Sequence, residues 1–235
     1  MEYKYPYKSR NRKYLKTLRL GQDYTIWRKK GLDLRAEVLE FSKKPVIEIG
    51  GPTRDGYYFL DDIEFGSKPV ITNYPENSWA FSFLSKTDKK RLASLIDETI
   101  DGRKMPYQDA SAGIFLMAAM SRTSDWYLEL SEEEQNKQKD KIENEFEVAQ
   151  LEEQQVAIGV LPPEKVQFAQ RIQIYLEIQR ALCPGGLFFS DGAVDEIFNL
   201  QRLGFELVAY VQEHVWEDMG WAGISFEFVM RKLPV

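Results

Sequence analysis

Cysteine and histidine are almost absent from the sequence, and their scarcity excludes two kinds of site. Cys183 is the single cysteine, so no disulfide can form within the chain. His214 is the single histidine, so the Cys and His ligands of a structural zinc site are lacking. We therefore predict no disulfide and no metal site.

Long apolar runs and an excess of positive charge are missing as well. No uncharged stretch approaches the roughly 20 residues that span a bilayer, and the first residues lack the apolar core of a signal peptide. The formal net charge of -6 argues against a surface devoted to binding phosphate backbones. These features predict a cytoplasmic protein with no membrane span.

Positive charge is nevertheless concentrated at the amino terminus. Residues 1–20 hold seven lysines and arginines, one acid and four tyrosines. Such a mixture suits binding to RNA or another anion. The alternative, which we favour, is a terminal arm with hydrated charges whose tyrosines pack on the domain. Beyond it, Asp33 is expected to cap a helix with Leu34, Val38 and Phe41 on one face.

Short apolar runs separated by helical stretches predict an α/β domain. Four of these runs cover residues 46–49, 69–72, 113–120 and 187–190. Buried strands that alternate with helices imply βαβ units and a mainly parallel sheet. Two later runs, 205–211 and 224–230, are joined by too few residues for a helical crossover, so we expect them to pair antiparallel.

A charged insertion at about residues 125–162 interrupts this pattern. Residues 129–153 carry ten acids, three lysines and a thin apolar stripe, which predicts an exposed helix. This helix would form a lid over a pocket, bind a partner helix, or lie hydrated across the domain. A second helix is expected to begin near Pro163. We therefore divide the chain into an arm and helix over 1–44 and one domain over 45–235.

Three motifs lie at turns beside the predicted strands. They are Glu48-Ile49-Gly50-Gly51-Pro52-Thr53, Asp101-Gly102 followed by Met105-Pro106-Tyr107, and Arg180-Ala181-Leu182-Cys183-Pro184-Gly185-Gly186. In this order the chain resembles class I S-adenosylmethionine-dependent methyltransferases over about residues 45–232. The resemblance implies a three-layer, Rossmann-like α/β fold with a seven-stranded, mostly parallel sheet, a C-terminal antiparallel hairpin and helices on both faces. It also implies S-adenosylmethionine as cofactor and a methyl acceptor, for which a small molecule is favoured.

The resemblance further implies a set of cofactor contacts, in which the glycine turn meets the methionine part, the Asp-Gly pair meets the adenine end and the third run forms the floor. The residues are Glu48, Gly50, Gly51, Thr53, Asn73, Asp101, Gly102, Ala118 and Met120. Asn73 stands where the family usually has an acid that holds the ribose hydroxyls. Pro52 and Arg54 replace two of the family's glycines, so the turn must follow a different path.

No catalytic residue is assigned, because methyl transfer needs an aligned nucleophile more than a base. If a base acts, the residues after strands or in the terminal connection are the places to look: Arg122, Asp125, Trp126, Asp191 and His214. All of these except Asp191 have a structural alternative as an ion pair, packed ring or surface group. Tyr57 and Tyr58 would lie over the cofactor or pack on the sheet, and Cys183 is expected to be a small buried hydrophobe.

Two alternative functions remain open at this point. A methyltransferase-like domain that has lost catalysis would serve as a binding or scaffold module. A nicotinamide-dependent oxidoreductase is less favoured, because residues 50–56 fit poorly to the GxGxxG turn of such enzymes. Gly113 also departs from the aspartate common in the family, a change that we expect to affect packing.

Overall fold

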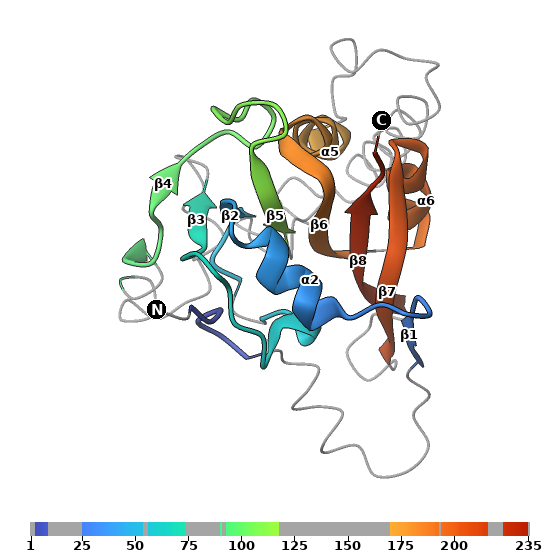
Figure 1. Cartoon of the computed structure of the whole chain (residues 1–235). Helices are drawn as coiled ribbons and strands as arrows, with labels where there is room; N and C mark the ends of the chain where they lie inside the picture. Colours follow the sequence, from blue (N-terminus) through green and yellow to red (C-terminus); the bar gives the residue numbers. More distant parts are fainter. Residues whose placement is uncertain are drawn as a thin grey trace, which may run out of the picture.

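The computed structural model describes residues 3–8, 25–53, 56–73, 90, 93–117, 170–192, 194–215 and 223–234. Their strands form one eight-stranded sheet with the order β1-β7-β8-β6-β5-β2-β3-β4 (Figure 1). The elements are β1 Thr25–Arg28, α2 Leu34–Phe41, β2 Val46–Ile49, the 3₁₀ helix η1 Tyr58–Leu60, β3 Val70–Asn73, β4 Glu98–Thr99, β5 Ala112–Met117, α5 Gln170–Ala181, β6 Leu182–Gly192, α6 Val194–Arg202, β7 Phe205–Val215 and β8 Gly223–Lys232.

The predicted mostly parallel α/β sheet with a terminal antiparallel hairpin is confirmed. Strands β4, β3, β2, β5 and β6 are parallel neighbours, and β8 pairs antiparallel with both β6 and β7. One strand extends the predicted seven, because β1 pairs antiparallel with the outer side of β7. Thr25 lies opposite Gln212, so this pairing joins segments far apart in the chain and left no local sequence signal.

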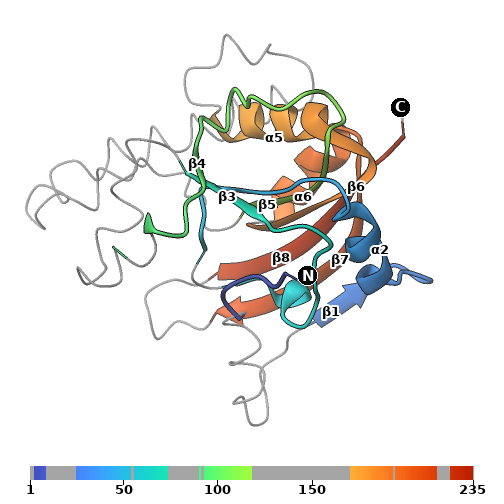
Figure 2. The same ribbon diagram turned by 60° about the vertical axis from the view of Figure 1, so that its left-hand side comes forward.

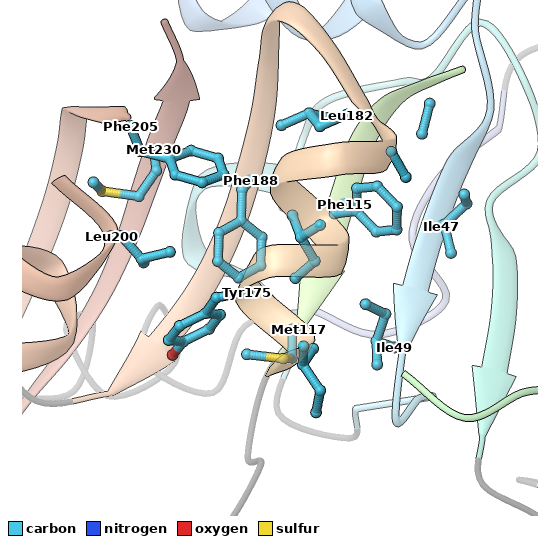
Figure 3. Packing of buried hydrophobic residues seen from close by; sticks show 14 of the residues in the cluster. Ile47, Ile49, Phe115, Met117, Tyr175, Leu182, Phe188, Leu200, Phe205 and Met230 are labelled. Atoms are coloured by element: carbon cyan, nitrogen blue, oxygen red, sulfur yellow. The ribbon is translucent and has the colours of Figure 1, made fainter. Parts of the chain in front are cut away.

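Side chains alternate between the two faces of the sheet and form two apolar clusters. On one face Ile47, Ile49 and Phe115 pack with Tyr175 of α5 (Figure 3). On the other face, Val46 and the alternate residues of β5 pack against α2. Figure 2 shows α5 and α6 on one side of the sheet and α2 on the other. The strand period of two residues produces both clusters, and each fully buried large side chain stabilises the fold by about 1.5–3 kcal/mol.

The helix α2 begins and packs as predicted. The carboxylate of Asp33 accepts a hydrogen bond of 3.0 Å from the Ala36 N–H, and Leu34 and Val38 are buried. The end of α2 lies directly against β5 at Gly113. A Cβ at Gly113 would overlap the carbonyl oxygen of Phe41, so only glycine permits this approach. The packing role expected for Gly113 is therefore confirmed.

The connection from α5 into β6 is also closely packed. Cys183 is buried, as predicted for a small hydrophobe near the helix end. The Lys232 ammonium donates hydrogen bonds to the carbonyl oxygens of Gln179 and Leu182. The Gln179 carbonyl is one that the last turn of a helix leaves without an intrahelical partner, and Leu182 is the first residue of β6. Lys232 thereby joins the end of β8 to the end of α5.

Candidate functional site

The order of the strands identifies one edge of the sheet as the place for a ligand. From β2 the chain moves outward to β3 and β4, and it then returns to β5 and continues to β6 on the opposite side. Neighbouring strands whose connections leave in opposite directions form a switch point, and α/β sheets bind ligands beyond the carboxyl ends of such strands. Here the switch point lies between β2, which ends at Ile49, and β5, which ends at Met117.

The glycine turn follows β2 directly and is packed against its own strand. Gly50 has a φ of 70°, a conformation that favours glycine, and the Gly51–Pro52 peptide bond is cis. The Gly51 N–H donates a hydrogen bond of 2.9 Å to the Thr72 carbonyl oxygen of β3. A Cβ at Gly51 would lie 2.5 Å from the Glu48 Oε2 atom. Glycine is therefore required at position 51 by close approach rather than by its backbone angles.

Asn73 joins the glycine turn to the segment after β4. Its side-chain Nδ2 donates a hydrogen bond of 2.7 Å to the Gly51 carbonyl oxygen. Its own carbonyl oxygen accepts one of 2.9 Å from the Ile100 N–H. Gly102 lies against Ile49, where an added Cβ would be 3.1 Å from the Ile49 Cγ2. The structure thus brings the predicted turn, Asn73 and the Asp101-Gly102 pair to the same edge of the sheet.

The carboxylate of Asp101 is engaged by Arg103. The Nε of Arg103 lies 2.9 Å from Oδ1, and its Nη2 lies 2.7 Å from Oδ2. The backbone N–H of Arg103 also donates to Oδ1 at 2.9 Å. This guanidinium lowers the pKa of Asp101, so the carboxylate is ionised at neutral pH. The two side chains are each 35% exposed, which leaves the pair open to solvent.

Glu48 faces away from α5 and lies beneath the turn that follows it. Its Oε1 accepts hydrogen bonds from the Tyr5 hydroxyl at 2.7 Å, the Thr53 N–H at 2.9 Å and the Tyr57 hydroxyl at 3.2 Å. Its Oε2 is buried and has no hydrogen-bond partner among the described residues. Burial raises the pKa of Glu48 to about 7, although the hydrogen bonds from Thr53, Tyr5 and Tyr57 lower it. The geometry makes Glu48 a support for the turn from inside the protein.

Arg180 connects α5 to the segment that follows Asp101-Gly102. Its guanidinium donates to the carbonyl oxygens of Tyr107 at 2.9 Å and Met105 at 3.3 Å, and to the Asp109 carboxylate at 2.6 Å. Glu177, one turn earlier on α5, accepts from the same guanidinium and from the Met105 N–H. A planar fork that bonds several acceptors at once is a property of arginine that lysine does not share. The arginine of the third motif thus holds the second motif in place.

Carboxylates also gather at the carboxyl end of β6. Asp191 lies opposite Glu227 of β8 in the strand register. Glu227 accepts a hydrogen bond of 3.2 Å from the Phe59 N–H, and burial, with the nearby charges of Asp191 and Asp61, raises its pKa to about 8. In the described part of the chain, no three His, Cys, Asp or Glu residues are placed to hold a metal ion. Of the candidate bases, Asp191 is the one whose side chain the structure describes at this edge.

The remaining candidates divide into packed residues and residues outside the described ranges. Tyr57 is buried and turns its hydroxyl to Glu48, while Tyr58 begins η1. The backbone of His214 lies opposite Ile224 in the hairpin. Arg54, Ala118, Met120, Arg122, Asp125, Trp126 and the insertion at about 125–162 lie outside the described residues.

The described part of the N-terminal arm, residues 3–8, packs on the domain, as the favoured alternative predicted. Tyr5 is 7% exposed, and Lys4 and Lys8 form ion pairs with Glu64 and Asp62. Residues 9–24, which carry most of the predicted basic cluster, lie outside the described residues. Sequence reasoning did not anticipate that the Tyr5 hydroxyl reaches Glu48. The interleaved tyrosines were the available signal.

Comparisons with known proteins find distant similarity to solved structures alone. No protein-family model and no curated protein matches the chain. A solved S-adenosylmethionine-dependent methyltransferase from Methanosarcina mazei is 13% identical, with coverage of 87% of this chain and 100% of that chain and a TM-score of 0.43. A proposed methyltransferase from Bacillus halodurans is 12% identical, with coverage of 86% and 99% and a TM-score of 0.45. The cyclase SpnF is 12% identical, with coverage of 92% and 88% and a TM-score of 0.44.

Within the described residues no helix is long and apolar enough to cross a membrane. The strand order and the C-terminal hairpin are the observations that define the architecture. The chain has the α/β fold that its resemblance to class I S-adenosylmethionine-dependent methyltransferases implies.

Proposed function

We propose that the chain is an S-adenosylmethionine-dependent methyltransferase. The cofactor would lie across the carboxyl ends of β2, β3 and β4, with its methionine part at Gly50 and Gly51, its ribose at Asn73 and its adenine at Asp101 and Gly102. The observation that carries this proposal is that these segments contact one another at the end of β2, one of the two strands of the switch point. Ala118 and Met120 complete the proposed set as its floor.

The proposed site would promote the reaction mainly by positioning the methyl acceptor against the cofactor. Transfer of a methyl group from a sulfonium requires an acceptor held in line with the breaking bond, and good alignment supplies much of the rate. Gly50 lets the backbone approach the cofactor, whereas the missing side chain of Gly51 makes room for Glu48 beneath the turn. Asp191, at the end of the strand beside β5, is placed to accept a proton if the acceptor carries one. We favour a small molecule as the acceptor.

Calorimetry tests the proposal directly. Saturable binding of S-adenosylmethionine or its demethylated product, with no binding of NAD, is the expected result. Asp101→Ala should weaken this binding about tenfold, the equivalent of one hydrogen bond to a charged group. The matched control is Asp109→Ala, which removes another acid near α5 and should leave the dissociation constant within about twofold. Equal effects of the two variants would contradict the assignment of Asp101.

A second candidate function is a methyltransferase-like domain without catalysis. The observation that favours it is that two candidate polar groups are already bonded within the chain, Asn73 to the Gly51 carbonyl and Asp101 to Arg103. A ligand at this edge would have to compete with those bonds or share them. Absence of binding at millimolar S-adenosylmethionine would favour this function over the first.

A further inference from the structure

A short N-terminal strap, residues 3–8, lies over the buried carboxylate of Glu48. Tyr3 pairs with Phe65 through two backbone hydrogen bonds of 2.7 and 3.4 Å, and Lys4 forms an ion pair of 2.8 Å with Glu64. These contacts fix the strap on the α2 face of the sheet, beside the segment that leads from η1 (Figure 2). Tyr5 is thereby buried in the second apolar cluster.

The hydroxyl of Tyr5 lies between two acceptors. The Glu48 Oε1 is 2.7 Å away and the Thr53 carbonyl oxygen is 3.1 Å away. A tyrosine hydroxyl carries one hydrogen, so it donates fully to only one of them at a time. When Glu48 is ionised, the hydrogen belongs to the carboxylate, because a charged acceptor forms the stronger bond. When Glu48 is protonated, the proton lies on Oε1, because the Tyr5 oxygen is an acceptor beside Oε1 whereas Oε2 has no hydrogen-bond partner among the described residues. Glu48 then donates to the Tyr5 oxygen, and Tyr5 is able to donate to Thr53.

Thr53 is the end of the glycine turn, and Glu48 and Tyr5 hold both of its backbone polar groups. Its N–H donates to Glu48 at 2.9 Å, and its carbonyl faces Tyr5. Thr53 is 7% exposed, so water does not readily replace either partner. A change in the direction of the Tyr5 hydrogen bond therefore acts on the backbone that carries Gly50 and Gly51.

We propose that Tyr5 is a positioning residue for the cofactor turn and that the hydrogen-bond chain Glu48–Tyr5–Thr53 reverses when Glu48 gains or loses its proton. This inference rests on the proposed function. The ionised state binds S-adenosylmethionine more tightly, because the cofactor's sulfonium and ammonium groups outweigh its one carboxylate and a carboxylate beneath the turn attracts the net positive charge. In that state Tyr5 and the Thr53 N–H both donate to Glu48.

The other titratable groups at this position do not change charge near neutral pH. Tyr57, from the segment before η1, and Tyr5 both face Glu48, and burial raises the pKa of each hydroxyl. Asp191 of β6 adds to the effect on Tyr57. Among the described residues, none forms an ion pair with Glu48. With its pKa raised to about 7 by burial, Glu48 is the group of this network that titrates in the physiological range.

Cofactor binding measured at pH 6, 7 and 8 tests the inference. In the wild type the affinity should rise from pH 6 to 8 by more than titration of the free cofactor explains. Tyr5→Phe should weaken binding about fivefold at pH 8 and flatten the profile, and Glu48→Gln should flatten it as well. Tyr7→Phe, which removes a neighbouring hydroxyl of the same strap, should behave like the wild type. An unchanged profile in Tyr5→Phe would overturn the inference, whereas absence of binding by the wild type would overturn the proposed function.

A second measurement needs no cofactor, so it tests the reversal of the hydrogen bonds independently of the proposed function. The carbonyl ¹³C shift of Thr53 should titrate in the wild type together with the side-chain carboxyl of Glu48. In Tyr5→Phe the Glu48 signal should still titrate, and the Thr53 carbonyl should shift much less than in the wild type, because only the direct bond from the Thr53 N–H to Glu48 remains. A Thr53 carbonyl that titrates equally in both proteins would overturn the proposed reversal.

Discussion

Replacement of Gly51 by alanine tests the close contact between the turn and the buried carboxylate. The new methyl group would lie 2.5 Å from the Glu48 Oε2, far inside van der Waals contact. Glu48 is completely buried and bonded to Tyr5 and Thr53, so it cannot turn into solvent without breaking those bonds. Overpacking of a core costs about 1–3 kcal/mol. Loss of one or two of the Glu48 hydrogen bonds adds about 1–2 kcal/mol.

The expected loss in the free energy of unfolding is therefore about 2–5 kcal/mol, measured by urea denaturation of Gly51→Ala against the wild type. Gly66→Ala is the matched control, because a Cβ there would lie 3.3 Å from the Ser42 carbonyl oxygen. This mild contact should cost about 1 kcal/mol or less. The difference between the two variants measures the crowding specific to position 51.

A double-mutant cycle identifies the source of that crowding. In a Glu48→Ala background the side chain that opposes the new methyl is gone, so Gly51→Ala should cost less than about 1 kcal/mol. The coupling free energy between the two positions should be about 2 kcal/mol or more. If Gly51→Ala costs the same in both backgrounds, the glycine is required for a reason other than Glu48, and the described packing of the turn is wrong.

Three further predictions concern stability. Gly113→Ala should lower the free energy of unfolding by about 3 kcal/mol or more, because its Cβ would overlap the Phe41 carbonyl; thermal melting of this variant checks it. Arg180→Lys should destabilise by about 1–2 kcal/mol in denaturant unfolding, since an ammonium cannot bond all of the acceptors that the guanidinium joins. Glu227 has a pKa of about 8 in the folded state and a lower one unfolded, so its stabilising effect is complete below pH 4.5 and is lost as the pH rises through 8. The free energy of unfolding, measured from pH 5 to 9, should fall by up to about 1.4 kcal/mol per pH unit because of this group. Glu227→Gln should remove this contribution to the pH dependence.

Much of the fold was predictable because its signals are local. The run 46–49 is apolar and ends in Gly50-Gly51, which is typical of a buried strand and a tight turn, and β2 occupies those residues. The connection of the terminal hairpin is too short for a crossover, so antiparallel pairing followed from chain length alone. The cap at Asp33 similarly depends on residues within one helical turn.

The remaining features depend on contacts between distant residues. β4 consists of Glu98 and Thr99, and β1 of four residues, so neither is long enough to show a period. Each forms because a partner strand offers free backbone groups at that place. Asp101 and Arg103 are only two positions apart in the sequence. The geometry of the turn nevertheless decides whether the carboxylate faces Arg103 or a ligand.

The face on which Glu48 lies could be predicted from the sequence, but its hydrogen-bond partner Tyr5 could not. Strand alternation puts Glu48 on the face of Val46, away from Ile47 and Ile49, and that much follows from the period of two. A carboxylate inside an apolar cluster is stable only if hydrogen bonds replace its water, and one of its donors, Tyr5, comes from a segment 43 residues earlier in the chain. The acid of the first motif is therefore supported by a residue outside the domain boundary predicted at 45. Truncation at that boundary would remove Tyr5 and β1 together. Glu48 would then have fewer hydrogen-bond donors, and β7 would have an unpaired edge. Cofactor binding and solubility should therefore both be measured on the full chain.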